Sequence, residues 1–219
     1  MPFLPCFADS ADAVQVFLQD AKYEEMLNKV CKTGQTPLHK ACNNGNVRVV
    51  VILVSAGRKK IEFNAKDNNG YTGFMLACQS GDLAIVRELV EKVDDLDTNA
   101  KNTDANTRFR PRRLGLDTKN YGQTGFMLAC QKGHLAIVRE LVEKVDNLGT
   151  SVKDSSGRTG FILACMHGHL PVVQQLLNLA KCDTEAEDDE GRTGCDLAVE
   201  MGKSEVADLI RQHRASKGE

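Results

Sequence analysis

Tryptophan is absent from the 219-residue sequence, and aromatic residues make up only 5% of it. Long apolar runs are also absent. No stretch approaches the roughly 18 to 20 residues that cross a bilayer, so the sequence predicts no transmembrane association. The first residues, MPFLPCFADSADA, lack the basic region and apolar core of a signal peptide. We therefore expect a protein of the cytoplasm or the nucleus.

Neither sign of charge dominates, because 28 lysine and arginine residues face 30 aspartate and glutamate residues, for a formal net charge of -2. A chain whose main partner is nucleic acid or an acidic membrane usually carries a clear excess of basic residues. The balance therefore gives no indication of either partner.

Paired cysteine spacings such as CxxC are missing, although the chain has eight cysteines, so the sequence does not indicate a zinc site. Four of the cysteines follow an alanine at equivalent places in a repeat, namely Cys42, Cys78, Cys130 and Cys165. Equivalent residues of stacked helices lie about 8 to 10 Å apart, which is too far for a disulfide. We expect buried thiols in a reducing compartment.

Catalytic motifs are missing as well, since the chain contains no GxSxG, HExxH or GxGxxG. Gly202-Lys203-Ser204 matches the end of a phosphate-binding loop, but Leu197 stands where its first glycine belongs. His167 and His169 could form a metal pair, yet no third ligand is apparent. We predict no catalytic residue, no cofactor and no metal, and hence a protein that is not an enzyme.

An internal repeat is the strongest positive feature of the sequence. The segment TGFMLACQSGDLAIVRELVEKV, Thr72 to Val93, returns from Thr124 with only two changes, and a fainter copy starts at Thr159. A threonine with a glycine nine residues later marks five units, which begin at Thr36, Thr72, Thr124, Thr159 and Thr193. In each unit the threonine predicts the cap of a short helix, and the glycine predicts its end.

A second helix follows each of these glycines, since apolar residues such as Val86, Leu89, Val90 and Val93 fall on one helical face. Polar, turn-rich segments such as NAKDNNGYT, Asn64 to Thr72, then close the units and predict hairpin-like turns. Each unit is therefore predicted to be two helices and a hairpin.

The segment TPLHKA, Thr36 to Ala41, resembles the signature of the ankyrin-repeat family, whose period is about 33 residues. The chain departs from that signature by placing Gly73, Gly125, Gly160 and Gly194 where proline is usual. The resemblance implies an all-α solenoid of about five stacked repeats, with a structural hydrogen bond from His39. We expect an N-terminal helical cap, a degenerate repeat, at 1–31, the repeat array at 32–214 and a C-terminal tail at 215–219.

The unit that begins at Thr72 is followed by an insertion. NAKN at Asn99 corresponds to NAKD at Asn64, so the surplus is 103–119, at a hairpin tip. It holds Arg108, Phe109, Arg110, Arg112 and Arg113. Arginine suits bidentate pairing with carboxylates or phosphates, so we expect an acidic or phosphorylated partner segment. A merely solvated loop, or one that binds RNA or anionic lipid, is the alternative.

By resemblance, the chain is expected to be a monomeric, non-catalytic scaffold that binds another protein through hairpin tips, a concave face and the inserted finger. The alternative from another class is a regulatory fragment of a larger signalling enzyme. The residues expected to contact the partner are Asn68, Asn69, Tyr71, Gln79, Arg108, Phe109, Arg110, Arg112, Arg113, Asn120, Tyr121, Gln123, Gln131, Lys132, Arg158, Met166, His167 and Arg192.

Overall fold

The computed structural model describes residues 12, 14, 15, 26–56, 61–103, 121–179 and 182–217. The chain forms two compact units, Met1–Arg113 and Leu114–Glu219. Most of the expected N-terminal cap and residues 104–119 of the insertion lie outside the described residues, and so do six predicted contact residues. Those six are Arg108, Phe109, Arg110, Arg112, Arg113 and Asn120.

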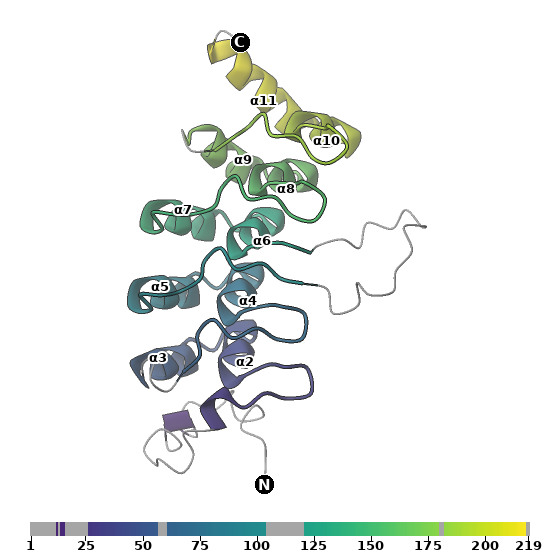
Figure 1. Ribbon diagram of the computed structural model, residues 1–219. Coiled ribbons are helices and arrows are strands. Elements are labelled where there is room, and N and C mark those ends of the chain that lie inside the picture. Colours follow the sequence, from purple (N-terminus) through teal and green to yellow (C-terminus); the bar gives the residue numbers. More distant parts are fainter. Residues whose placement is uncertain are drawn as a thin grey trace. The chain divides into compact units, whose positions relative to one another are not determined.

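The first unit contains two helix pairs, α2 (Pro37–Asn43) with α3 (Val47–Ala56) and α4 (Gly73–Ser80) with α5 (Leu83–Lys92). The short helices α2 and α4 pack against each other, and so do the longer helices α3 and α5 (Figure 1). The first helix of each pair carries the hairpin that precedes it. We call α2 and α4 the inner helices of this unit.

The second unit contains three pairs, α6 (Gly125–Lys132) with α7 (Leu135–Lys144), α8 (Gly160–His167) with α9 (Leu170–Leu177), and α10 (Gly194–Glu200) with α11 (Ser204–Lys217). The inner helices α6, α8 and α10 pack in succession, and the outer helices α7, α9 and α11 form a second row (Figure 1). The predicted all-helical repeat is therefore confirmed. Helix α11 continues past Arg214 to Lys217, into the expected tail.

The predicted caps begin and end the inner helices. The hydroxyls of Thr72, Thr124 and Thr159 each accept a hydrogen bond from the backbone N–H three residues on, at 3.2 to 3.4 Å. Gly81 and Gly133 end α4 and α6 with φ of 89° and 75°, in the left-handed region that favours glycine.

His39 makes the structural hydrogen bonds that the resemblance predicted. Its Nδ1 atom accepts from the Thr36 N–H at 3.2 Å, and its Nε2 atom lies 2.8 Å from the carbonyl of Tyr71 in the next hairpin. The ring is 1% exposed, so it joins two repeats from inside the unit.

Packing restricts two of the positions where glycine replaces proline, Gly160 and Gly194. A Cβ atom on Gly160 would lie 2.7 Å from Cε1 of Phe126, and one on Gly194 would lie 3.0 Å from Cε1 of Phe161. Both phenylalanines are almost completely buried. A phenylalanine at the second helical position of one repeat therefore fills the space that a proline would need at the start of the next helix.

The described helices include none that is long and apolar enough to cross a membrane. The only extended pairing within the described ranges is an isolated bridge between Glu187 and Thr193, inside one hairpin.

Candidate protein-binding surface

In the hairpins that contain Asp67 and Asp154, the aspartate fixes the conformation of the tip. Asp67 accepts hydrogen bonds from the backbone N–H groups of Asn69 and Tyr71, both at 2.9 Å. Asp154 does the same for Ser156 and Arg158 at 2.9 and 3.0 Å. Because the carboxylate satisfies N–H groups two and four residues on, the tip keeps one conformation from repeat to repeat.

Neighbouring tips are joined by backbone hydrogen bonds. In the first unit the Thr103 N–H donates to the Asn69 carbonyl at 2.9 Å, and the Asn68 N–H donates to the Thr33 carbonyl at 3.1 Å. In the second unit Ser155 donates to Tyr121 at 2.9 Å and Asp189 to Ser156 at 3.0 Å. The hairpins of each unit therefore present one continuous, pre-organised surface.

Several predicted contact residues lie on this surface or at the exposed ends of the inner helices. Asn68, Asn69, Lys132 and His167 are exposed, whereas Tyr71, Gln79, Tyr121, Met166 and Arg192 are half-buried. Asn68 also has a structural role, because its Nδ2 atom donates to the Lys32 carbonyl at 3.0 Å.

The expected exposure of three other residues is wrong, since Gln123, Gln131 and Arg158 are only 0%, 6% and 4% exposed. Arg158 folds back over its own hairpin, where Nε donates to Oδ2 of Asp154 at 3.0 Å. Its Nη1 atom lies 4.0 Å from the sulfur of Met166. Arg158 therefore holds the tip together from inside.

Arg192 occupies the equivalent position in the next repeat, but its ion pairs leave the side chain partly exposed. Its guanidinium bonds to Asp188 at 2.8 Å, to Glu190 at 3.0 Å and to Glu200 at 3.1 Å, and its side chain remains 37% exposed. Burial of Asp188 opposes its ionisation, but the backbone and guanidinium bonds from Arg192 outweigh burial and lower the Asp188 pKa. Asp188 therefore stays ionised and keeps Arg192 at the tip.

Each histidine of the possible metal pair is hydrogen-bonded to a backbone carbonyl. His167 Nδ1 lies 2.9 Å from the Leu163 carbonyl, and His169 Nε2 lies 2.7 Å from the Gln131 carbonyl. Burial lowers the pKa of His167, and the positive charges of Arg158 and Lys132 lower it further. The hydrogen bond to the Leu163 carbonyl raises this pKa but does not outweigh burial. Nowhere in the described ranges do three or more histidine, cysteine or acidic side chains converge so as to hold a metal.

The buried cysteines are poor nucleophiles. Cys42 and Cys78 are completely buried, and desolvation raises the pKa of both thiols well above the ordinary value. Burial likewise raises the pKa of Cys182 to about 12. The thiolate is the reactive form, so these residues act as small apolar side chains.

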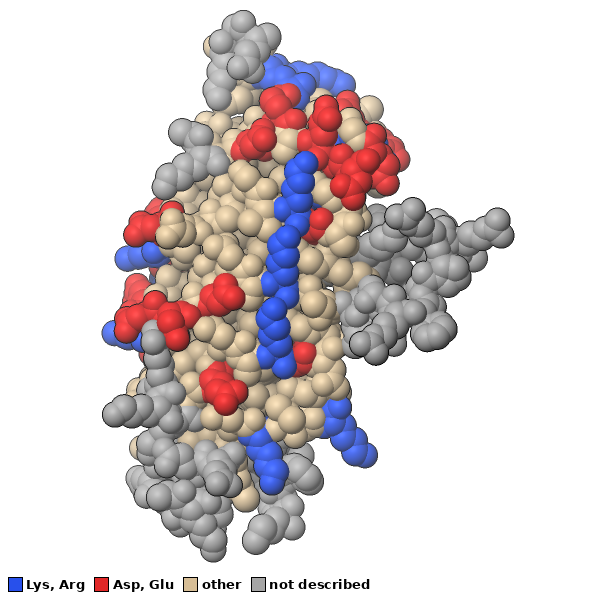
Figure 2. Space-filling view, in the orientation of Figure 1, with Lys and Arg blue, Asp and Glu red and all other residues tan. Residues whose placement is uncertain are grey.

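The resemblance also offers Asp189, Glu190 and Glu200 of the fifth repeat as positions for a partner, and these belong to one strongly charged feature, the carboxylates of the hairpin at 183–190 and of α10. Figure 2 shows them gathered beside α10, in the upper part of the view. Their signal was present in the sequence as the run EAEDDEGR from Glu185 to Arg192.

The family model for ankyrin repeats, in three copies, matches residues 6–102, 108–179 and 126–219. The chain is 26% identical over 187 residues to the ankyrin repeat protein YahD of Escherichia coli (strain K12), a match that covers 84% of this chain and 82% of that protein.

Shorter matches link the chain to larger proteins. It is 36% identical over 64 residues to the human SMC5-SMC6 complex localization factor protein 1, which is 29% of this chain and 6% of that protein. It is 30% identical over 89 residues to the tyrosine-protein kinase HTK16 of Hydra vulgaris, which is 41% of this chain and 11% of the kinase. In both cases the match spans only a small part of the larger relative.

Proposed function

The chain belongs to the ankyrin-repeat family, and we propose that it is a non-catalytic scaffold that binds a partner protein through its hairpin tips and the exposed ends of its inner helices. Ankyrin repeats generally mediate protein–protein interaction. The proposal extends that general role to named surfaces of this chain.

The proposal depends on one observation, namely which sequence positions differ from repeat to repeat. Phe74, Phe126 and Phe161 are buried at the same position of their repeats, and an Ala-Cys pair follows each of them at the same spacing. The ends of the inner helices vary instead, through Gln79-Ser80, Gln131-Lys132, Met166-His167 and Glu200-Met201. Packing fixes the first set, whereas the exposed members of the second set, such as Ser80, Lys132 and His167, can vary to suit a partner.

The pre-organised backbone of the hairpin tips supports the same proposal. The tip backbones are bonded to one another before any partner arrives, so little conformational entropy is lost when they bind. Tyr71 and Tyr121 stand half-buried at these tips and offer large contact area at low entropic cost. We further propose that the chain acts as a monomer in the cytoplasm or nucleus, where its buried thiols stay reduced.

Site-specific photo-crosslinking tests this proposal. A photoreactive amino acid at exposed Ser155, on a tip, or at exposed Lys132, at the end of α6, should crosslink the full chain to a partner in extract of its native cell. The same amino acid at Gln174 is the control, because Gln174 is exposed on α9. Helix α9 belongs to the outer row, which lies on the other side of the inner helices from the hairpins (Figure 1). Crosslinks that form equally well from Gln174, or only from it, would contradict the proposal.

A regulatory part of a larger signalling enzyme is the second candidate. The similarity to the kinase HTK16 favours it, since that match covers ankyrin-type sequence within a much longer protein. The full coding sequence decides between the two, because a catalytic domain in the same open reading frame is required by this candidate.

A further inference from the structure

The fifth repeat consists of the hairpin at 183–190 and helices α10 and α11. It carries a concentration of negative charge that the rest of the chain does not share. Between Asp183 and Glu200 eight side chains are acidic and one, Arg192, is basic, although the whole chain has a net charge of only -2. All but one of these carboxylates are exposed, the exception being the hairpin residue Asp188. This stretch therefore forms a negatively charged surface (Figure 2), whereas the remaining 27 basic and 22 acidic side chains give the rest of the chain a formal net charge of +5.

Basic neighbours neutralise only part of this charge. Arg192 is shared among three carboxylates, and Arg214 pairs with Glu185 at the start of the hairpin. Within the described part of the chain, Glu187 and Asp189 make no ion pair. Like charges held together in this way repel one another and destabilise the fold unless a cation or a basic partner approaches.

The hairpin does not need these carboxylates in order to fold, as the fourth repeat shows. Asp188 bonds to the N–H groups of its tip at 3.0 and 2.9 Å, and Asp154 does so at 2.9 and 3.0 Å in the fourth repeat. At four other acidic positions of the fifth hairpin, the fourth has neutral or basic residues. Glu185, Glu187, Asp189 and Glu190 stand where the fourth repeat has Ser151, Lys153, Ser155 and Ser156.

Exposed apolar side chains adjoin the charged surface. Val199 and Met201 flank Glu200 at the end of α10 and are 52% and 44% exposed. The residue equivalent to Val199 in α8 is Cys165, which is fully buried because Gly194 of the next helix packs on it. Exposed apolar groups rimmed by charge are typical of protein-binding surfaces.

Bound metal does not account for the carboxylates. They spread along the hairpin and α10, and no three of them converge into a metal-binding group among the residues that the structure describes. A cation that matches this arrangement must itself be extended. A polypeptide with several basic side chains has that shape.

We propose that Glu187, Asp189, Glu190 and Glu200, together with Val199 and Met201, bind a lysine- or arginine-rich segment of a partner protein that also carries an apolar side chain. The proposal rests on the proposed protein-binding function and names the chemistry of the partner at one end of the surface. The basic side chains meet the carboxylates of the tip, and the apolar side chain covers the end of α10.

Three fluorescein-labelled peptides of equal length test the proposal on the full chain. One is lysine-rich with leucine, the second has serine in place of leucine, and the third is glutamate-rich. The test variant is Glu187→Gln/Asp189→Ser/Glu190→Ser. Its two serines are the residues that the fourth hairpin tolerates at the same positions.

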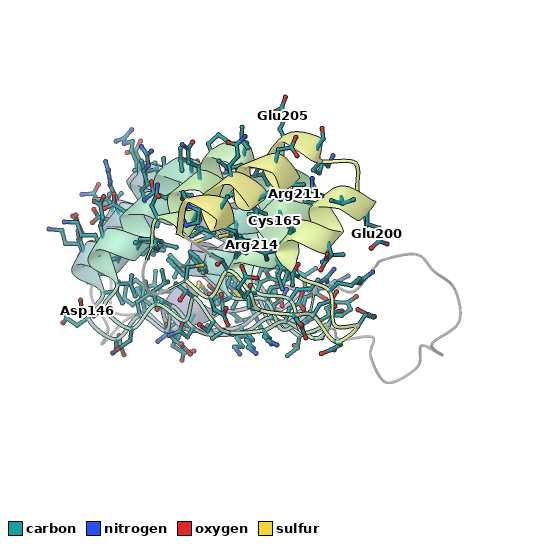
Figure 3. The ribbon with its side chains drawn as sticks, turned by 90° about the horizontal axis from the view of Figure 1, so that it is seen from above. Asp146, Cys165, Glu200, Glu205, Arg211 and Arg214 are labelled. Atoms are coloured by element: carbon teal, nitrogen blue, oxygen red, sulfur yellow. The ribbon has the colours of Figure 1, made fainter. Side chains whose placement is uncertain are left out.

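The control variant Glu143→Lys/Asp146→Ser has the same formal net charge as the test variant. Glu143 and Asp146 are exposed, and Asp146 lies on the opposite side of the unit from Glu200 (Figure 3). Thermal melts of both variants should first show that they are folded. A second variant, Val199→Ser/Met201→Gln, tests the apolar part of the surface.

The lysine–leucine peptide should bind roughly tenfold more weakly to the test variant, since each exposed charge pair contributes a factor of about two to five, and almost unchanged to the control. Binding to the wild-type chain should weaken as salt rises. Val199→Ser/Met201→Gln should remove the advantage of the leucine peptide over the serine peptide.

Equal weakening by test and control variants, or preference for the glutamate-rich peptide, would overturn the proposal. If Ser155 and Lys132 still crosslink to a partner in that case, only the inferred chemistry of the partner fails. If those crosslinks are also missing, the protein-binding function itself fails.

Discussion

Substituting Gly160→Ala tests how the repeats pack on one another. The added Cβ atom would lie 2.7 Å from Cε1 of Phe126 and 3.2 Å from Sγ of Cys130, whereas carbon atoms in good contact are about 3.5 to 4.0 Å apart. Phe126 is 1% exposed and Cys130 is completely buried, so neither can move away into solvent. Overpacking of this kind costs about 1 to 3 kcal/mol. The better helix propensity of alanine offsets up to about 1 kcal/mol, so we expect a net loss of about 1 to 2 kcal/mol.

The chain supplies a matched control in Gly73→Ala. Gly73 occupies the same position of its repeat, but the nearest atom to its added Cβ is Cγ of Leu38 at 3.1 Å. A shift of a few tenths of an ångström relieves that contact. Gly73→Ala should therefore be clearly milder than Gly160→Ala.

A double-mutant cycle then tests the cause directly. Phe126→Leu recreates at Gly160 the arrangement that Leu38 and Gly73 already have. The double variant Phe126→Leu/Gly160→Ala should be less destabilised than the sum of its parts, with a coupling of about 0.5 to 2 kcal/mol, measured by urea unfolding. Equal effects at Gly160 and Gly73, with additive behaviour in the cycle, would refute the packing account of these glycines.

The helices could be predicted from the sequence because their ends depend on local chemistry. Thr72 caps α4 and Gly81 ends it in the left-handed conformation, as the spacing of the two residues predicted. The copy at Thr124 and Gly133 behaves in the same way. Near-identical sequence in successive repeats made the period visible, and the period led to the fold.

The contact residues were harder to predict because exposure depends on how a side chain turns. Arg158 was expected on the surface, but it bonds to Asp154 from within the hairpin. A signal for this pairing exists in the sequence, since Asp and Arg stand four residues apart both here and at Asp188 and Arg192. Tyr71 stands at the arginine position in the second repeat, so the pattern is present in only some of the hairpins.

Exposure also depends on what packs beyond a residue, which a repeat pattern does not show. Val199 occupies the position of buried Cys165 in its repeat, and by register alone it would be placed in the core. It is 52% exposed because the described structure holds no following helix pair over this face of α10. The exposure of Val199 therefore depends on the neighbouring helix pair and not on its own position in the repeat.

Three further predictions concern stability and the insertion. Leu141 is completely buried, so Leu141→Ala should lower the free energy of unfolding by about 2 to 5 kcal/mol. Tyr71→Ala, at a half-buried tip, should lower it far less. Equal effects of the two changes would show that the assigned repeat register is wrong. Burial lowers the pKa of His39 below 6.5 despite its bond to Tyr71, so the unfolded chain binds more protons at acid pH. Stability should fall as the pH drops through about 6.5, and His39→Gln should reduce that slope in thermal melts. Replacing 103–119 by a short turn like that at 68–70 should leave the chain folded with an unchanged or slightly higher Tm, because a shorter loop loses less closure entropy. If the arginines of that segment bind acidic or phosphorylated partners, the replacement should also weaken binding of a phosphoserine-rich peptide and reduce its salt dependence. Unfolding of this variant would show that the segment belongs to the core, and unchanged peptide binding would leave it a solvated insertion.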